Sequence, residues 1–179
     1  MPNYCTNELT ITSDNAGFLQ SLMNELKQAD SNEVDFLSKL VPFTEETNYV
    51  WDYDWCVENW GTKWDIFDVY HASLDGDTLT VCFTTAWSPP ISALQKATAA
   101  YNLEWELYWI EEGVCQTGLA KGFVDDPTFV DESWELMLDD HPEEYIPGDI
   151  LDTFPYIIQD WEECQQENDQ EELKEPQDA

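Results

Sequence analysis

IFDVYHASLDGDTLTVCFTTAW, residues 66–87, has the pattern of two β-strands joined by a tight turn. Its two arms, IFDVYHASL and TLTVCFTTAW, are rich in β-branched and aromatic residues, and Asp75-Gly76-Asp77 lies between them. Asp-Gly between two such runs is typical of the short turn of a β-hairpin. The stretch therefore predicts an antiparallel pair of strands.

The segments before and after this hairpin each predict one strand and one helix. Residues 5–12 alternate in the manner of a strand, and residues 17–29 carry apolar side chains at helical spacing. After the hairpin, Ser88-Pro89-Pro90 is typical of a helix start, so a helix is expected over residues 89–101. The alternation of residues 103–113 then predicts a half-buried strand.

The resulting order, β-α-β-β-α-β, predicts an α+β ferredoxin-like domain, which is an antiparallel sheet with both helices on one face. Residues 115–123 are expected to add a last strand or hairpin arm. The predicted domain therefore spans residues 1–123.

The composition changes after this domain. Residues 1–124 contain 19 acidic residues and five lysines, whereas residues 125–179 contain 20 acidic residues and one lysine. Apolar and aromatic residues continue among these acids, which predicts an acidic, mainly helical extension over residues 124–164 that packs on the domain. Residues 165–179 have little to bury and are expected to form a disordered acidic tail.

The charge of the chain is strongly negative. It has 39 Asp and Glu, six Lys and no Arg, for a formal net charge of −33. Without arginine or a basic stripe, direct binding to nucleic acid or to an anionic membrane is not expected, and a basic protein partner is expected instead. Duplex DNA carries one negative charge per about 1.7 Å of its axis, so a charge of −33 equals that of about 56 Å of duplex. A compact chain of this length has a diameter of about 40 Å, so its charge per unit length would be similar to that of DNA.

The residues most often used in catalysis and metal binding form no known signature. The five cysteines have no close spacing and are expected to be reduced thiols: Cys5, Cys56, Cys82, Cys115 and Cys164. The two histidines, His71 and His141, match no catalytic motif, and no calcium loop or glycine-rich phosphate loop occurs. No catalytic residue, metal or cofactor is therefore predicted. A signal peptide and a membrane-spanning apolar run are also missing from the sequence, so a cytoplasmic location is expected.

NWGTKWD, residues 59–65, places two tryptophans around a glycine and a lysine. Gly61 permits a tight backbone path, and Lys63 is expected to neutralise Asp65 or Glu58. We interpret the stretch as part of a structural motif of the scaffold, which also includes Trp87 and Pro89. Its residues are Asn59, Trp60, Gly61, Lys63, Trp64, Trp87 and Pro89.

An aromatic cluster around this motif has two interpretations. It consists of Trp51, Tyr53, Trp55, Trp60 and Trp64. Packing at the edge of a core is the commoner role of spaced tryptophans, but the same residues could line a ligand cage or a partner surface. A pocket lined by several of these indoles would favour the second interpretation.

Three motifs, in this order along the chain, resemble a known family. They are MPNYCTNELTI at residues 1–11, NWGTKWD at 59–65 and FTTAWSPP at 83–90. Together they resemble the YubB-type ferredoxin-like domain family of phage and conjugative-plasmid proteins over about residues 1–123. The resemblance implies a ferredoxin-like fold and a mobile-element origin, and hence a location in the host cytoplasm. It implies no established activity and no catalytic residues, and neither the missing arginine nor the acidic extension belongs to the family pattern.

The leading functional hypothesis is a non-enzymatic phage or plasmid protein whose acidic C-terminal surface imitates nucleic acid. It would occupy the nucleic-acid-binding cleft of a host defence protein, such as a nuclease or restriction complex. The carboxylates expected to contact this partner flank aromatic residues: Asp125, Asp126, Asp131, Glu132, Glu135, Asp139, Asp140, Glu143, Glu144, Asp160, Glu162 and Glu163.

Two alternatives for the negative charge stay open. The charge could belong to a solvated tail without a partner, or to a salt-adapted proteome. The function could instead be that of a small-molecule or peptide-binding module that uses the Trp51–Trp64 region, or of an enzyme with an unrecognised site. The sequence predicts neither the identity of the target nor the oligomeric state.

Overall fold

The computed structural model describes residues 3–27, 34–124, 126–137 and 140–172. The chain forms two compact units, residues 1–133 and 134–179. Among the described residues, no helix is both long and apolar enough to cross a membrane.

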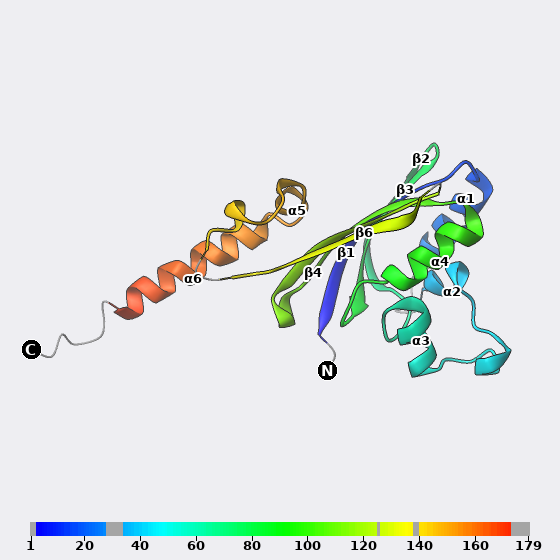
Figure 1. Ribbon diagram of the computed structural model, residues 1–179, viewed down its shortest axis with the longest axis horizontal. Helices are drawn as coiled ribbons and strands as arrows, with labels where there is room; N and C mark the ends of the chain where they lie inside the picture. Colours follow the sequence, from blue (N-terminus) through cyan, green and yellow to red (C-terminus); the bar gives the residue numbers. More distant parts are fainter. Residues whose placement is uncertain (1–2, 28–33, 125, 138–139, 173–179) are drawn as a thin grey trace, which may run out of the picture. The chain divides into compact units, whose positions relative to one another are not determined.

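A six-stranded sheet with the order β2-β3-β1-β4-β5-β6 dominates the first unit (Figure 1). The strands are β1 Tyr4–Thr12, β2 Phe67–Asp75, β3 Thr78–Ala86, β4 Glu104–Glu111, β5 Gln116–Phe123 and β6 Asp126–Glu135. Strand β1 pairs antiparallel with both β3 and β4, and β2 pairs antiparallel with β3. The order of the first four strands is that of a ferredoxin-like sheet, so the predicted α+β ferredoxin-like fold is confirmed.

The predicted hairpin joins β2 to β3. Asp75 pairs with Thr78 across the turn, and Gly76 between them has a φ angle of 61°. Glycine adopts this left-handed conformation without the steric cost that a side chain would bring. The turn chemistry read from the sequence therefore sets the register of the two strands.

The helices of the first unit lie on one side of the sheet (Figure 1). They are α1 Ala16–Lys27, α2 Leu37–Leu40, α3 Tyr53–Trp60 and α4 Ile91–Tyr101, with the short 3-10 helices η1 Glu45–Thr47 and η2 Glu112–Val114. Buried side chains of α1 and α4, among them Leu22 and Leu94, belong to the same core as Leu9 and Leu107 of the sheet. The two predicted helices are thus present, and α2 and α3 are an insertion between α1 and β2.

Two tryptophans of β4 are accommodated by glycines on β5. Trp105 lies opposite Gly122, and Trp109 lies opposite Gly118. A Cβ atom at Gly118 would lie only 2.5 Å from the Trp109 ring. The missing side chains of β5 therefore make room for the large rings on the neighbouring strand.

The acidic extension differs from the prediction at both ends. Its first part forms the strand β6 rather than a helix, because residues such as Val130 and Trp134 favour extended backbone. Its last helix continues to Glu172, beyond the predicted start of the tail at Gln165, since Gln and Glu are good helix formers. Residues 173–179 of the predicted tail lie outside the described residues.

The second unit is helical after β6. It contains η3 Pro142–Glu144, α5 Gly148–Thr153 and α6 Tyr156–Glu172. The ring of His141 lies 4.6 Å from the ring of Trp161, and the Tyr145 hydroxyl accepts a hydrogen bond from the Met137 backbone N–H at 2.9 Å. These contacts hold the segment before α5 against α6 and against the residues that follow β6.

Candidate functional site

The NWGTKWD stretch forms the corner between α3 and β2. Helix α3 ends at Gly61, whose φ angle of 84° places it in the left-handed region and whose N–H bonds to the Val57 carbonyl at 3.2 Å. The Ser88 hydroxyl donates to the Gly61 carbonyl at 2.5 Å, and a Cβ at Gly61 would lie 3.3 Å from the Pro89 carbonyl oxygen. Glycine is needed here both for its backbone conformation and for this close approach.

The side chains of this corner bind three parts of the first unit together. The buried Trp60 indole donates to the Val41 carbonyl at 2.8 Å. Thr62, which is also buried, donates to the Ala86 carbonyl at 2.9 Å. The Asn59 amide accepts from the Lys96 ammonium at 2.6 Å, which links α3 to α4.

Asp65 ends the motif and has a role that the sequence did not reveal. One of its carboxylate oxygens accepts the backbone N–H groups of Leu37 at 2.7 Å and of Ile66 at 2.8 Å, and the other accepts that of Ser38 at 2.9 Å. The N–H of Phe36 adds a fourth bond at 3.2 Å. Burial raises the pKa of Asp65 to about 6, while these hydrogen bonds act in the opposite direction. The side chain thus tethers the start of α2 to the start of β2.

Lys63 does not form the ion pair predicted for it. Among the described residues it has no salt bridge to Asp65 or Glu58, and its ammonium lies 4.7 Å from the centroid of the Trp64 ring and 5.0 Å from that of Trp87. Aromatic faces attract a cation in this geometry. The lysine therefore connects Trp64 to Trp87, rather than compensating a neighbouring acid.

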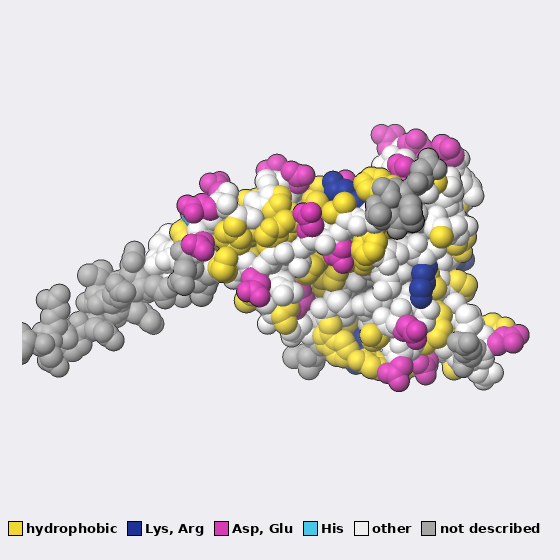
Figure 2. Space-filling model, viewed as in Figure 1, with side chains coloured by type: hydrophobic (Ala, Val, Ile, Leu, Met, Phe, Trp, Pro, Cys, Tyr) yellow, Lys and Arg dark blue, Asp and Glu magenta, His cyan; other side chains and the backbone are white. Residues whose placement is uncertain are grey.

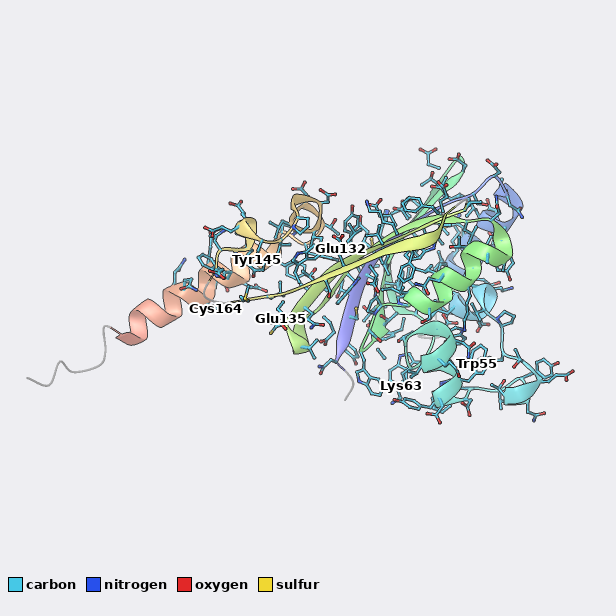
Figure 3. All side chains as sticks on the ribbon, viewed as in Figure 1. Trp55, Lys63, Glu132, Glu135, Tyr145 and Cys164 are labelled. Atoms are coloured by element: carbon cyan, nitrogen blue, oxygen red, sulfur yellow. The ribbon has the colours of Figure 1, made fainter. Side chains whose placement is uncertain are left out.

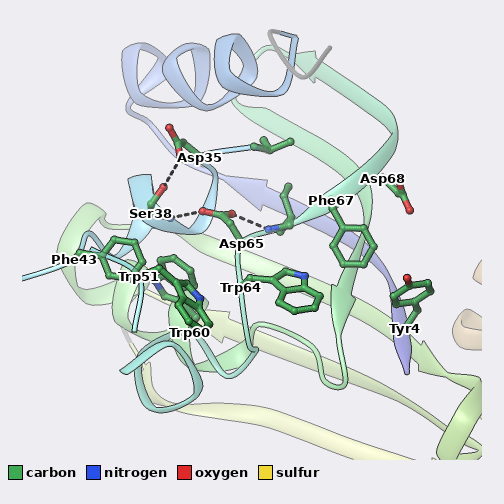
Figure 4. Close-up of a pocket in the computed structure, with 12 residues that line it drawn as sticks. Tyr4, Asp35, Ser38, Phe43, Trp51, Trp60, Trp64, Asp65, Phe67 and Asp68 are labelled. Atoms are coloured by element: carbon green, nitrogen blue, oxygen red, sulfur yellow. Dashed lines mark hydrogen bonds between the residues drawn. The ribbon is translucent and has the colours of Figure 1, made fainter. Parts of the chain in front are cut away.

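An aromatic pocket lies beside this corner (Figure 4). It has a volume of about 630 Å³ and is lined by Tyr4, Val34, Asp35, Ser38, Phe43, Trp51, Trp60, Trp64, Asp65, Ile66, Phe67 and Asp68. Ring contacts connect its aromatic residues in pairs, with centroids 5.0 Å apart for Phe43 and Trp60 and 5.3 Å apart for Tyr4 and Phe67. Three indoles of the predicted aromatic cluster thus line one pocket of a size usual for ligand sites.

The remaining two aromatic residues of that cluster are placed differently. Trp55 is buried and packs against Phe43 and Trp60, so it belongs to the core. Tyr53 is exposed, and the centroid of its ring lies 6.0 Å from that of the Trp87 ring. Three acidic residues of the pocket, Asp35, Asp65 and Asp68, were not predicted from the sequence. No motif or spacing in the sequence relates them, and only the fold brings them together.

The acids predicted to contact a partner lie in both units. Asp125 and Asp139 lie outside the described residues, and only the backbone of Asp126 is described. The other nine all have exposed side chains: Asp131, Glu132, Glu135, Asp140, Glu143, Glu144, Asp160, Glu162 and Glu163. Glu132 and Glu135 lie on β6 (Figure 3), and on the face drawn in Figure 2 acidic side chains greatly outnumber basic ones.

Few of these nine carboxylates have a polar partner. Among the described residues, Glu143 lies 3.9 Å from His141 Nδ1, and Glu163 accepts a hydrogen bond from Gln159 at 3.0 Å. Local desolvation raises the pKa of Asp131 although its side chain is exposed. The described candidate carboxylates are therefore exposed charges with few compensating partners.

Three residues of types used in catalysis face one another on the sheet, outside the pocket. Glu8, Cys82 and His71 occupy facing positions on β1, β3 and β2, and the Cys82 thiol lies 3.8 Å from the Glu8 carboxylate. Burial, and then the charge of Glu8, raises the pKa of Cys82 to about 11. Because the thiolate is the nucleophilic form, this environment disfavours nucleophilic catalysis by Cys82. Within the described residues, no group of three His, Cys, Asp or Glu side chains could hold a metal ion.

Comparison with known proteins gives one similarity. Residues 59–144 match the family model of a ferredoxin-like domain in Api92-like protein. No curated protein and no solved structure matches the chain. The matched range contains NWGTKWD and FTTAWSPP, two of the three motifs singled out in the sequence, and runs from the end of α3 through η3. From Asn59 to Glu144 this chain is therefore similar to the ferredoxin-like domain of Api92-like proteins.

Proposed function

We propose that this chain is a non-enzymatic protein that binds a positively charged surface of a partner protein. One observation carries the proposal: between Lys121 and Lys174 the sequence has 18 Asp and Glu residues and no Lys or Arg, and all nine candidate carboxylates with described side chains are exposed. Exposed charges of one sign attract an oppositely charged partner over about a Debye length.

The finer form of the proposal is that the partner surface is a nucleic-acid-binding cleft. The carboxylates follow one another closely along β6, η3 and α6, and the formal net charge of −33 equals that of about 56 Å of duplex DNA. Aromatic residues between the acids, such as Trp134 and Trp161, could add apolar contacts. A host nuclease or restriction complex is the proposed target, in line with the resemblance to proteins of phages and plasmids.

A capture experiment with matched variants tests this proposal. The full chain is immobilised, exposed to a lysate of a bacterial host at low salt, and eluted either with a short DNA duplex or with poly-glutamate of equal charge. A nucleic-acid mimic should retain proteins that the duplex displaces more efficiently than poly-glutamate does, because the duplex fits the occupied cleft.

Two variants with the same net charge locate the surface. The first neutralises six candidate acids, as D131N, E132Q, E135Q, D140N, E143Q and E144Q. The second neutralises six exposed acids elsewhere, as D14N, D54N, E58Q, D75N, E104Q and E112Q. Capture should be lost in the first variant and retained in the second. Equal retention by both, or elution by poly-glutamate alone, would contradict the proposed mimicry.

The aromatic pocket supports a second candidate function, that of a small-molecule or peptide-binding module. The specific observation is that Trp51 and Trp64, which are accessible, line one pocket together with the buried Trp60, and a pocket lined by several indoles favours ligand binding. Trp51 has 53% of its surface exposed, so part of the pocket wall is accessible to a ligand. A change of tryptophan fluorescence in a ligand screen, lost in Trp51→Leu, would support this function.

A further inference from the structure

We propose that the aromatic pocket binds an organic cation, that is, an alkylammonium or guanidinium group. The inference rests on the second candidate function, since it names the ligand class of that pocket. It is independent of the acidic C-terminal surface, because every lining residue belongs to the first unit.

The aromatic wall provides the first part of the argument. Six of the twelve lining residues are aromatic; of the three tryptophans among them Trp60 is buried, whereas Trp51 and Trp64 are accessible, and tryptophan faces attract cations more strongly than those of other rings. The rings come from separate segments: Tyr4 from β1, Phe43 and Trp51 from the insertion, and Phe67 from β2. Rings held by separate elements surround a group from several directions, as in known cages for quaternary ammonium.

Charge provides the second part. Three carboxylates, those of Asp35, Asp65 and Asp68, line the pocket, whereas none of its described lining residues is a lysine, arginine or histidine. The Asp65 oxygens are already occupied by backbone N–H groups, so they contribute charge rather than a free acceptor. Asp35 and Asp68 are exposed and have no salt bridge among the described residues. The carboxylates would repel an anion, and a neutral ligand would gain no charge–charge attraction from them.

The backbone at Asp68 provides the third part. Asp68 has a φ angle of 48°, and the pairing of β2 with β3 shifts register between Phe67 and His71. Such bulges redirect side chains and are frequent beside binding sites, and left-handed backbone persists only where the surrounding structure holds it. At this bulge, Phe67 and Asp68 both line the pocket instead of alternating to opposite faces as in a regular strand.

Lys63 shows that the neighbouring indole accepts a cation. Its ammonium, which does not line the pocket, lies 4.7 Å from the centroid of the Trp64 ring. An external cation would use the same attraction on the rings that Lys63 leaves open, such as Trp51 and Phe67.

Titration with a matched pair of ligands tests the inference. Choline and 3,3-dimethyl-1-butanol have nearly the same shape, but only choline carries a positive charge. Calorimetry and tryptophan fluorescence of the full chain should show choline binding about tenfold more tightly or better, because aromatic faces and carboxylates attract only the charged ligand. N-acetyl-arginine amide and N-acetyl-lysine amide, compared with choline, distinguish a protein side chain from a free small cation as the natural source.

Three variants connect this binding to the pocket. Trp51→Leu, and D35N combined with D68N, should each weaken choline binding at least about threefold without changing the fold measured by circular dichroism. Trp87→Leu is the control, because Trp87 is also exposed and also contacts Lys63 but does not line the pocket. It should leave choline binding unchanged.

The outcomes separate this inference from the function on which it rests. Equal binding of choline and its neutral isostere, with loss in Trp51→Leu, would overturn the cation preference and leave a ligand-binding pocket. Choline binding that Trp87→Leu weakens as much as Trp51→Leu does would place the cation elsewhere and overturn the inference. Absence of binding by all four ligands would also overturn it.

Discussion

Replacement of Asp65 by asparagine tests how burial and hydrogen bonding compete at a single carboxylate. In D65N the amide oxygen can still accept the N–H groups of Leu37 and Ile66, which bond to one carboxylate oxygen. The amide NH₂ would face the Ser38 N–H, which bonds to the other oxygen at 2.9 Å. One buried donor is then left without an acceptor, at a cost of about 1–3 kcal/mol.

The pH dependence of this difference follows from the raised pKa. Burial raises the pKa of Asp65 from 3.8 to about 6, so the folded state binds a proton more readily than the unfolded state. Asp65 therefore stabilises the fold most below pH 3.8, and this contribution is lost as the pH rises through 6, about 3 kcal/mol in all. At pH 5, one unit below the folded pKa, about 1.4 kcal/mol of it is present, and at pH 7.5 almost none.

Urea denaturation of the wild type and D65N at pH 5 and pH 7.5 measures this. Both pH values lie above the sequence pI of about 4.1. The contributions of the other acidic residues to the free energy of unfolding cancel in the difference, because both proteins contain them. The free energy of unfolding of the wild type, relative to D65N, should fall by about 1.4 kcal/mol between the two pH values. A relative free energy that does not change between pH 5 and pH 7.5 would refute the reasoning, because the four N–H donors would then offset burial and hold the pKa of Asp65 at or below 3.8, so that both pH values lie above its titration.

Five further substitutions, two pairs and a single one, test the fold through denaturation midpoints. Gly118→Ala should destabilise by about 1–3 kcal/mol, because its Cβ would lie 2.5 Å from the Trp109 ring and 2.6 Å from the Glu132 carbonyl oxygen; an effect below about 0.5 kcal/mol would mean that the ring moves freely. Gly61→Ala should cost more than Gly76→Ala, since both have positive φ angles but only Gly61 has backbone within 4 Å of the added atom; equal costs would assign the whole effect to the backbone conformation. Asp52→Ala should cost about 1 kcal/mol through loss of its 2.8 Å bond to the Trp55 N–H at the start of α3, and Asp54→Ala, in the first turn of the same helix, should cost less.

The ferredoxin-like part of the fold was predictable because its signals are local. The Asp-Gly turn, the proline after Ser88 and the alternation of β4 each act over a few residues, and β1, β2, β3, α4 and β4 all appear within a few residues of their expected bounds. Strand β6 was missed for the opposite reason. Its segment is acidic, so composition suggested helix, whereas its pairing at the sheet edge is a tertiary effect.

The candidate pocket was predictable only in part. Spaced tryptophans marked Trp51, Trp60 and Trp64 as residues with a common role, and the structure does bring them to one pocket. The acids could not be found in this way, because 39 carboxylates in one chain make any single one uninformative. Asp65 illustrates the limit: its partners at residues 36–38 are nearly 30 positions away, so only the folded insertion reveals its role.

Added salt should weaken the two proposed binding functions to different extents. The long-range field of a chain with net charge −33 raises the local concentration of any cation, and this effect decreases as salt shortens the Debye length from about 10 Å at 0.1 M to about 3 Å at 1 M. Contact between a cation and an indole acts within about 6 Å and partly excludes water, so added salt weakens it less. Choline bound in the pocket should therefore survive a salt concentration that releases a basic protein from the acidic surface. A choline affinity that falls with salt as steeply as partner capture does would show that net charge alone attracts the cation, and that the aromatic walls add nothing specific.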